Sequence, residues 1–322
     1  MIIPPRQKFA ALPTPIEELP RLSQYLQGPR LLIKRDDLTG LGLGGNKNRK
    51  LEFLLAEALA NGARTLITTG AVQSNHCRQT AAAAAHFGLD CILVLAGQPP
   101  DRPTGNLLLD HLFGAEITWT APSDRDTILR NIFDQAWQQG RRPYLVPYGG
   151  SSPTGACAYT FALQELVSQN TSIDWIVFAS SSGGTQAGMV LGAKLFGYSG
   201  RILGISVDES QLTLQTRVAN LASATADFLG EKIVFSPSAI LVNADYLGEG
   251  YSILGQPEKE AIKIFARITG LLLDPVYTGR AAAGLIGLIR EGFFHRNETV
   301  LFWHTGGAPA LFADRYVELG QS

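Results

Sequence analysis

Short runs of β-branched and aliphatic residues alternate with helical patterns along almost the whole chain. Six such runs are clear, at 65–69, 91–95, 143–146, 175–178, 202–207 and 299–303. Helical patterns stand between them, for example from Asn75 onwards, over 106–110 and over 186–195. Continuously apolar strands separated by helices are typical of parallel sheets that are covered on both faces. The pattern therefore predicts an α/β protein.

The strand–helix units form two sets, one between Lys50 and Gly150 and a second from Pro153 onwards. We predict two α/β domains, each built on an open, mostly parallel sheet. In such sheets, ligands bind at the carboxyl ends of the strands, where the connecting loops gather. Every motif described below lies in a loop of this kind, so we expect the functional site in the cleft between the domains.

Composition and charge exclude several classes of protein. The 322 residues include 27 basic and 28 acidic side chains, so the chain has no electrostatic footprint for nucleic acid or for a membrane surface. The three cysteines show neither paired nor metal-like spacing, which favours a reducing compartment. The most apolar stretch, 81–97, is interrupted by His86 and Asp90, and the N-terminus has no signal-peptide pattern. We expect a cytoplasmic protein without a metal site.

Lys47 follows Gly44 and Gly45 at the start of a predicted helix. A lysine held at a glycine-lined turn can act as a fixed amine nucleophile that forms a Schiff base with a carbonyl compound. A solvated surface lysine is the alternative interpretation. The glycines also spell the dinucleotide-binding motif G-x-G-x-x-G over 40–45, but no strand precedes them and no acidic residue ends the next strand. We interpret them as positions where the backbone approaches a ligand closely.

Two further turns join a predicted strand to a helix. In the first, Ser74 and Asn75 are good N-cap residues, and the free N–H groups of the same helix start would bind a carboxylate or a phosphate. His76 is either an acid–base group or a histidine hydrogen-bonded at the helix start. In the second, the Ser/Gly-rich loop 180–185 offers amides and hydroxyls that would cradle a phosphate. This loop lacks the lysine of a nucleotide P-loop, and an ordinary surface turn is its alternative explanation.

The segments 274–279 and 304–310 also follow apolar runs and precede helices. Together with Lys47 and the Ser/Gly loop, they supply an amine, an anion cradle, a phenol and small residues for contacts to a ring. That set suits pyridoxal phosphate, with its aldehyde on the lysine, its phosphate on the loop and its ring nitrogen on a group after the last strand.

These motifs together resemble the fold-type II pyridoxal-phosphate enzymes of the D-cysteine desulfhydrase and 1-aminocyclopropane-1-carboxylate (ACC) deaminase family. The resemblance runs from Leu32 to Leu311 and rests on Gly-Gly-Asn-Lys-Asn-Arg-Lys-Leu-Glu at 44–52, Gln-Ser-Asn-His at 73–76 and Asp-Pro-Val-Tyr-Thr-Gly at 274–279. It implies a tryptophan synthase β-like fold with a large cofactor-binding domain over 1–49 and 156–322, and a small domain over 50–155. It also implies a homodimer.

The resemblance also implies roles for individual residues. Lys47 corresponds to the Schiff-base lysine, Asn75 to the partner of the ring hydroxyl, and Thr278 to the contact of the pyridine nitrogen. The other implied cofactor contacts are Ser181, Ser182, Gly183, Gly184, Thr185, Thr305 and Gly306. The substrate carboxylate is expected at Ser74, Asn75 and His76. Ser74, Tyr277 and Tyr251 are expected beside the reacting part of the substrate. The base is expected to be Lys47, once it is freed from the cofactor, or another group on the correct face.

Three positions favour the desulfhydrase branch. ACC deaminases typically have Gln, Glu and Leu where this chain has His76, Thr278 and Thr305. A neutral residue at 278 would leave the ring a weaker electron sink than a carboxylate would, which suffices when thiolate leaves Cβ. The loop after Tyr251 departs from the family, which usually has glycine directly after this tyrosine. On the basis of His76, Thr278 and Thr305, we predict α,β-elimination of D-cysteine to pyruvate, sulfide and ammonia. ACC deaminase, cysteate sulfo-lyase and a non-catalytic binder of pyridoxal phosphate or amino acids are the alternatives.

Overall fold

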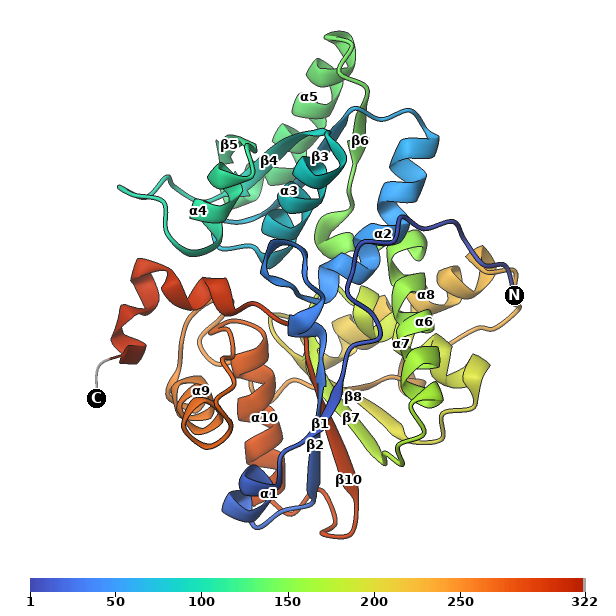
Figure 1. The fold of residues 1–322 in the computed structure, drawn as a ribbon, viewed down its shortest axis with the longest axis vertical. Helices are drawn as coiled ribbons and strands as arrows, with labels where there is room; N and C mark the ends of the chain where they lie inside the picture. The colour runs from blue at the N-terminus through green and yellow to red at the C-terminus, as the bar shows by residue number, and fades with distance from the viewer. Residues whose placement is uncertain (321–322) are drawn as a thin grey trace.

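The computed structural model describes residues 1–320 and contains two sheets of different size (Figure 1). In the larger sheet the strand order is β1 (Ile16–Glu18), β2 (Arg30–Arg35), β10 (Thr299–His304), β7 (Trp175–Ser180), β8 (Arg201–Ser206) and β9 (Leu241–Asn243). In the smaller sheet it is β5 (Glu116–Thr120), β4 (Asp90–Ala96), β3 (Thr65–Ala71) and β6 (Pro143–Leu145). Every strand pair is parallel except β1 with β2, which confirms the predicted architecture.

Ten α-helices lie within the described residues. They are α1 (Pro20–Leu26), α2 (Asn46–Ala60), α3 (Asn75–Phe87), α4 (Gly105–Leu112), α5 (Arg125–Gln138), α6 (Pro153–Ser168), α7 (Gly184–Phe196), α8 (Gln211–Phe228), α9 (Gln256–Thr269) and α10 (Thr278–Arg290). Short 3-10 turns connect them, namely η1 (Asp36–Leu38), η2 (Leu41–Leu43), η3 (Pro122–Asp124), η4 (Tyr148–Gly150), η5 (Pro237–Ala239), η6 (Ala308–Phe312) and η7 (Asp314–Gly320). None of the helices in residues 1–320 combines the length and apolar character that crossing a bilayer requires.

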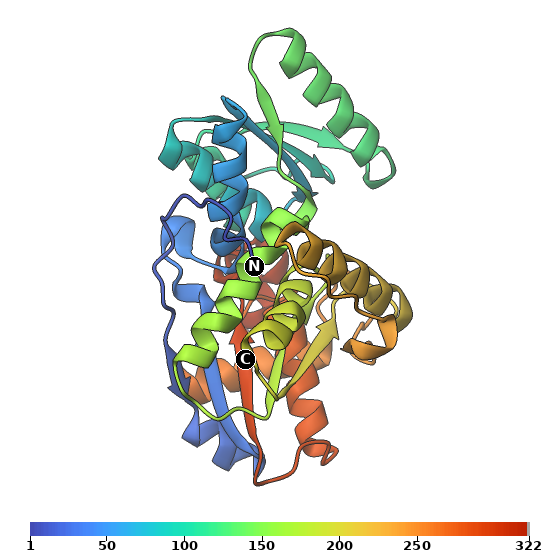
Figure 2. The ribbon, with the colours of Figure 1, turned by 90° about the vertical axis from the view of Figure 1, so that its right-hand side faces the viewer.

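Both sheets are covered on two faces because alternate residues of each strand point to opposite sides. Val300 and Phe302 of β10 pack with side chains of α1, α9 and α10. Leu301, between them, packs with side chains of α6 and α7. In the small sheet, Leu66 lies in a cluster with α2, α3 and α4, while Ile67 packs against α5. The predicted double coverage is therefore present in both halves of the molecule (Figure 2).

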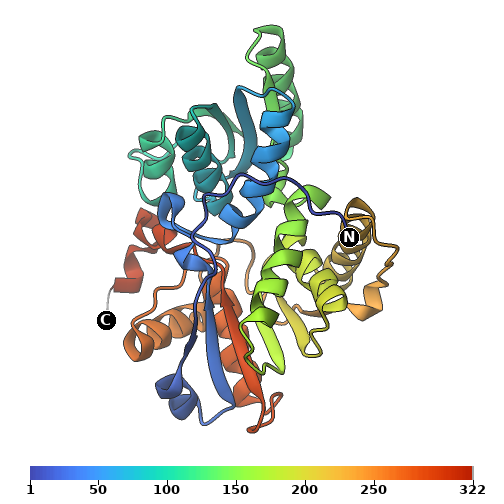
Figure 3. The same cartoon turned by 45° about the vertical axis from the view of Figure 1, so that its right-hand side comes forward.

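Helix α2 connects the two halves, since it packs against α6 of the large half and α3 of the small half (Figure 3). The four strands of the small sheet all fall within the range predicted for the small domain, and the six strands of the large sheet fall outside it. The exact domain boundaries, 1–49 with 156–322 and 50–155, stay a prediction.

A buried ionic cluster fixes α2 against the large half. The Arg49 guanidinium donates to both oxygens of Asp36, at 2.8 and 3.0 Å, and to both oxygens of Glu165, at 2.9 Å. Tyr159 donates to Asp36 at 2.6 Å, and Lys34 donates to Glu165 at 2.6 Å. Burial alone would raise the pKa of Asp36, but the guanidinium of Arg49 outweighs it and holds that pKa below its usual range. The cluster therefore keeps its carboxylates ionised.

We expect Arg49→Leu to lower the free energy of unfolding by about 3–5 kcal/mol, because it leaves the buried Asp36 carboxylate without its cation. Urea denaturation followed by circular dichroism measures the change. Arg290→Leu is the matched control, since Arg290 pairs with Glu260 at the surface, where each side chain is about half exposed. The control should lose less than about 1 kcal/mol. Equal losses in the two variants would contradict this role for the cluster.

Candidate active site

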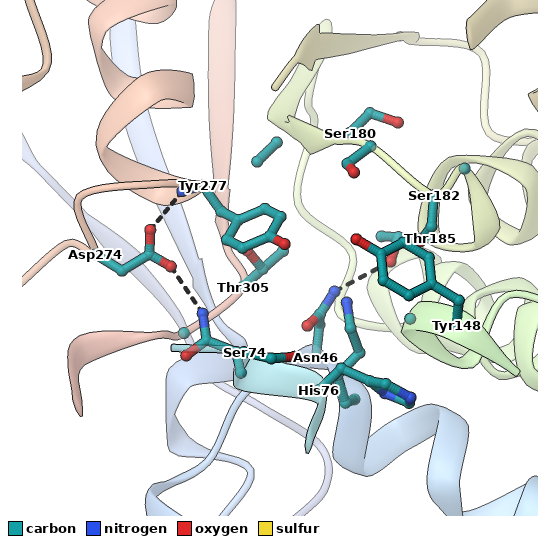
Figure 4. Close-up of a pocket in the computed structure, with 17 residues that line it drawn as sticks. Asn46, Ser74, His76, Tyr148, Ser180, Ser182, Thr185, Asp274, Tyr277 and Thr305 are labelled. Carbon is teal, nitrogen blue, oxygen red and sulfur yellow. Dashed lines mark hydrogen bonds between the residues drawn. The ribbon is translucent and has the colours of Figure 1, made fainter. Parts of the chain in front are cut away.

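The predicted motifs converge on one pocket between the two halves of the molecule. Its walls come from the start of α2, the turn between β3 and α3, the turn η4, the loop between β7 and α7, and the segments around Asp274 and Thr305. Several of these loops follow the carboxyl ends of parallel strands, which is where the fold class predicts a ligand site. Figure 4 shows the labelled residues around the pocket, on these separate elements.

Most of the residues predicted for the site line this pocket. They are Lys47, Ser74, Asn75, His76, Ser181, Ser182, Gly183, Thr185, Tyr277, Thr305 and Gly306. Three predicted residues do not line it, namely Gly184, Tyr251 and Thr278. Tyr251 lies directly behind the wall, with its hydroxyl 2.7 Å from that of Tyr277. Gly184 is the first residue of α7, beneath the loop.

Thr278 is fully buried at the start of α10, and its hydroxyl accepts the backbone N–H of Asp274 at 2.7 Å. Its predicted contact with the pyridine nitrogen stays a prediction. Asp274 supplies the carboxylate that faces the pocket. The sequence motifs predicted no role for it. Asp274 accepts the backbone N–H of Val276 at 2.8 Å and the Asn75 side-chain amide at 3.0 Å. It therefore joins the two halves across the pocket.

Lys47 stands in the first turn of α2, because Gly45 and Asn46 hold the backbone there. The N–H of Gly45 donates to the carbonyl of Asp36, and that of Asn46 donates to the carbonyl of Thr305, each at 3.0 Å. Burial lowers the pKa of the Lys47 amine to about 8, although the negative charge of Asp274 acts to raise it. The amine is therefore partly neutral near pH 8, which is the form in which it is a nucleophile.

The loop between β7 and α7 has the geometry of an anion cradle. Gly183, with a φ of 83°, turns the chain so that α7 begins at Gly184. A Cβ at Gly184 would lie 2.5 Å from Ser151 Oγ and 3.0 Å from Lys50 Nζ, so only glycine fits there. The first N–H of the helix, that of Gly184, donates to Ser151 Oγ at 3.2 Å, and the start of the helix presents a positive partial charge to the pocket. This arrangement fits the phosphate of the predicted cofactor.

Lys50 lies behind the cradle and was missed in the motif analysis. It is fully buried, and its amine donates to the carbonyl of Gly149 at 3.0 Å. Burial, and then the charge of Lys47, lower its pKa well below the usual range. The signal was present in the sequence, since residues three apart on a helix share a face and Lys50 follows Lys47 by three. A bound phosphate would compensate this charge.

His76 is buried in the part of the pocket wall that the start of α3 forms. Its Nε2 is 2.9 Å from the hydroxyl of Thr68, and its Nδ1 is buried without a hydrogen-bond partner in the described residues. Burial, together with the charges of Lys47 and Lys50, holds the pKa of His76 well below its usual range. The imidazole is therefore neutral. Ser180 Oγ, also on the pocket wall, is a second buried polar atom without a partner among residues 1–320. Such orphaned groups fit a site that is completed by a ligand.

Two tyrosines form the remaining wall of the pocket. Tyr277 and Tyr148 reach in from opposite sides, with their hydroxyls towards the middle (Figure 4). Burial, and then the nearby Tyr251 and Tyr148, raise the pKa of Tyr277 well above its usual range. Its hydroxyl therefore stays protonated at neutral pH. Tyr148 was also missed in the motif analysis, although it follows β6 at the end of the sheet where a ligand is expected.

Comparison with known proteins agrees with this geometry. The family model described as "Pyridoxal-phosphate dependent enzyme" matches residues 8–306. A solved structure described as an ACC deaminase homologue is 38% identical, with a TM-score of 0.90, and the match covers 98% of this chain and 96% of that one.

Two more distant structures share the fold. A hydrogen sulfide-producing enzyme from Fusobacterium nucleatum is 15% identical with a TM-score of 0.65, over 92% of this chain and 96% of that one. A fungal L-serine ammonia-lyase from Rhizomucor miehei is 17% identical with a TM-score of 0.69, over 98% and 99% of the two chains.

The low pKa of Lys47 predicts how cofactor capture depends on pH. With a pKa of about 8, the neutral fraction of the amine rises about fivefold between pH 7 and pH 8 and is nearly constant from pH 9 to pH 10. The rate at which cofactor-free protein captures pyridoxal phosphate, followed by absorbance, should show the same plateau. A rate that still rises about tenfold between pH 9 and pH 10 would mean that the pKa of Lys47 is not lowered.

Proposed function

The chain belongs to the pyridoxal-phosphate dependent enzymes, and on that premise we propose that it is a lyase that eliminates sulfide from D-cysteine. The observation that carries this proposal is the hydroxyl pair of Tyr277 and Tyr251, 2.7 Å apart. Tyr277 lines the pocket, and its raised pKa keeps it a hydrogen-bond donor. A hydrogen-bond donor at this place would stabilise the negative charge on sulfur as thiolate leaves Cβ.

In this proposal each part of the pocket binds one part of the reactants. Lys47 holds the cofactor aldehyde, and the start of α7 with Lys50 holds its phosphate. Ser74, Asn75 and His76 bind the substrate carboxylate at the start of α3, where free N–H groups favour an anion. Two hydrogen bonds hold the loop that would bind the phosphate. The hydroxyls of Ser182 and Ser151 are 2.7 Å apart, and the Asn46 amide donates to the Thr185 hydroxyl at 3.1 Å. These contacts support the rigidity that such a cradle needs.

The chemistry then needs one base and one hydrogen-bond donor at the leaving group. Pyridoxal phosphate, when bound, supplies an electron sink that acidifies the Cα–H bond of the amino acid. The neutral amine of Lys47 takes the α-proton at Nζ, and its lowered pKa supports this role near neutral pH. Tyr277 meets the sulfur that departs from Cβ. The released aminoacrylate is hydrolysed to pyruvate and ammonia.

ACC deamination is the second candidate, and the similarity to an ACC deaminase homologue at 38% identity favours it. Two of the three positions that distinguish the branches, His76 and Thr305, line the pocket. Both carry the residue of the desulfhydrase branch, which supports the prediction of a desulfhydrase. Asp274 supplies a buried carboxylate in the same pocket, with a pKa that burial raises to about 6. The argument from a neutral residue at 278 therefore does not by itself exclude ACC as a substrate.

The product formed from each substrate tests the proposal. We expect sulfide and pyruvate from D-cysteine, no turnover of L-cysteine or ACC, and loss of more than about a thousandfold in rate for Lys47→Ala. 2-Oxobutyrate from ACC would favour the second candidate, and sulfite from cysteate would favour a sulfo-lyase. Bound cofactor without any product would indicate a binding protein. Full activity of Lys47→Ala would refute the assignment of the lysine.

The leaving group tests the role of Tyr277. Tyr277→Phe should lower kcat with D-cysteine by about a hundredfold, because thiolate then leaves without a hydrogen-bond donor that stabilises its charge. With β-chloro-D-alanine the loss should be less than about tenfold, since chloride leaves more readily and depends less on this donor. Tyr251→Phe is the matched control, because it removes a hydroxyl behind the wall and should cost less than Tyr277→Phe with D-cysteine. Equal losses with the two substrates would contradict a role at the leaving group.

A further inference from the structure

A chain of side-chain hydrogen bonds connects Asn75 of the pocket to the interior of the small half. Its middle member is Asn106, which is fully buried in the first turn of α4. Asn106 Oδ1 accepts from Arg78 Nε at 2.7 Å, and Asn106 Nδ2 donates to Asn75 Oδ1 at 2.9 Å. The other hydrogen of Nδ2 goes to the carbonyl of Gln73, also at 2.9 Å. Both N–H hydrogens of the Asn106 amide are therefore used.

Arg78 fixes the direction of this chain at its inner end. A guanidinium only donates hydrogen bonds, whereas an asparagine amide donates at one end and accepts at the other. Arg78 is fully buried, and its two other nitrogens donate to the carbonyls of Gly42 and Gly44. Asn106 must therefore turn its oxygen to Arg78, which leaves its nitrogen for Asn75.

Asp274 fixes the direction at the outer end. Asn75 turns its oxygen to Asn106, so its Nδ2 faces Asp274 and donates to that carboxylate at 3.0 Å. Burial raises the pKa of Asp274 to about 6, so the carboxylate is mostly ionised at pH 8, and an ionised carboxylate only accepts. The chain between Arg78 and Asp274 therefore permits a single orientation of each amide.

This orientation leaves one donor for a ligand. The Asn75 nitrogen carries two hydrogens, and among residues 1–320 only Asp274 accepts from it. Asn75 lines the pocket, so its second hydrogen is available to an acceptor there. The predicted acceptor is the ring hydroxyl oxygen of pyridoxal phosphate. If the Asn75 amide were turned around, its oxygen would stand in place of the donor and the hydrogen bond would be lost.

We propose that Asn106 is a positioning residue of the cofactor site, which holds the Asn75 amide with its free N–H towards the pocket. Through this restraint the site prefers a cofactor that carries an oxygen on its ring. The inference rests on the cofactor site of the proposed function, but not on the choice of substrate. Arg78 and Asp274 set the polarity of the chain, and Asn106 transmits it to Asn75.

The test compares two ligands on the full chain freed of cofactor at pH 8. One is pyridoxal phosphate, and the other is 3-deoxypyridoxal phosphate, which lacks the ring hydroxyl. Dissociation constants are measured by absorbance, and the ratio of the analogue's constant to that of pyridoxal phosphate is taken for each variant. A change that damages the pocket in general affects both ligands and cancels in this ratio.

Asn106→Asp keeps the size of the side chain and an acceptor for Arg78, but it presents an oxygen to Asn75 in place of the donor. The Asn75 amide then turns its nitrogen to the new carboxylate and its oxygen to the pocket. We expect the ratio of dissociation constants to fall about tenfold. Asn106→Ala removes the donor without adding an acceptor. It should lower the ratio by less, about threefold, and it gives the test a second variant if Asn106→Asp does not fold.

Thr69→Val is the matched control. It removes a buried hydrogen bond of the small half, from Thr69 Oγ1 to the carbonyl of Val94 at 2.6 Å, that lies outside the chain. The ratio should change by less than about twofold in this variant. Asn75→Ala tests the premise and should lower the ratio about tenfold, since it removes the donor itself.

The outcomes separate this inference from the proposed function. Dissociation constants that rise by the same factor for both ligands in the Asn106 variants would show a purely structural role and overturn the inference. An unchanged ratio in Asn75→Ala would overturn it as well. Neither result concerns the substrate, because no amino acid is present. Failure of the unchanged enzyme to form sulfide from D-cysteine would refute the proposed function and leave the role of Asn106 intact.

Discussion

The contact between Arg49 and the carboxylates of Asp36 and Glu165 is the interaction on which the site depends most. Arg49 and Lys47 are two residues apart on α2, so their side chains leave the helix in nearly opposite directions. One is bound in the large half while the other faces the pocket. A buried ion pair contributes little net stability, because desolvation offsets most of its attraction, yet it tolerates only one geometry. The cluster therefore fixes the direction of Lys47 more than it stabilises the fold.

The second constraint runs across the cleft. Asn75 donates to Asp274 at 3.0 Å and accepts from the Asn106 amide at 2.9 Å, so its side chain joins the small half to the segment before α10. A Cβ at Gly307 would lie 2.0 Å from Asp274 Oδ2, and this explains why glycine stands there. The two halves thus meet through polar side chains with defined partners, which keeps the start of α3 aligned with Lys47.

The elements that the sequence predicts well are those with simple periodicity. The runs at 65–69, 91–95 and 175–178 became β3, β4 and β7, because their apolar residues pack on both faces. Strand β2 was missed, although it lies inside the large sheet between β1 and β10. Its Lys34 is fully buried and bound to Glu165, 131 positions away. In a single sequence, charged residues such as Lys34 favour the prediction of an exposed loop, because the distant residue that neutralises the charge cannot be recognised.

The site residues in glycine- and hydroxyl-rich turns between a strand and a helix were recognisable from the local sequence. Lys50 and Tyr148 carried weaker local signals, namely the spacing of Lys50 from Lys47 and the position of Tyr148 after β6. The role of Asp274 depends on its contact with Asn75 in the other half of the molecule.

The pocket's charges explain why these last residues belong together. Within residues 1–320, its walls hold the amine of Lys47 and the carboxylate of Asp274, and Lys50 lies behind the anion cradle. Burial and mutual repulsion lower the pKa values of Lys50 and His76, and burial raises that of Asp274. Each shift disfavours the charged form of its group, as expected where water is excluded without a counterion. A phosphate dianion near Lys50 and a carboxylate near His76 would reverse the first two shifts. The pocket is therefore electrostatically complementary to two anions, which is what an amino acid and pyridoxal phosphate bring to it.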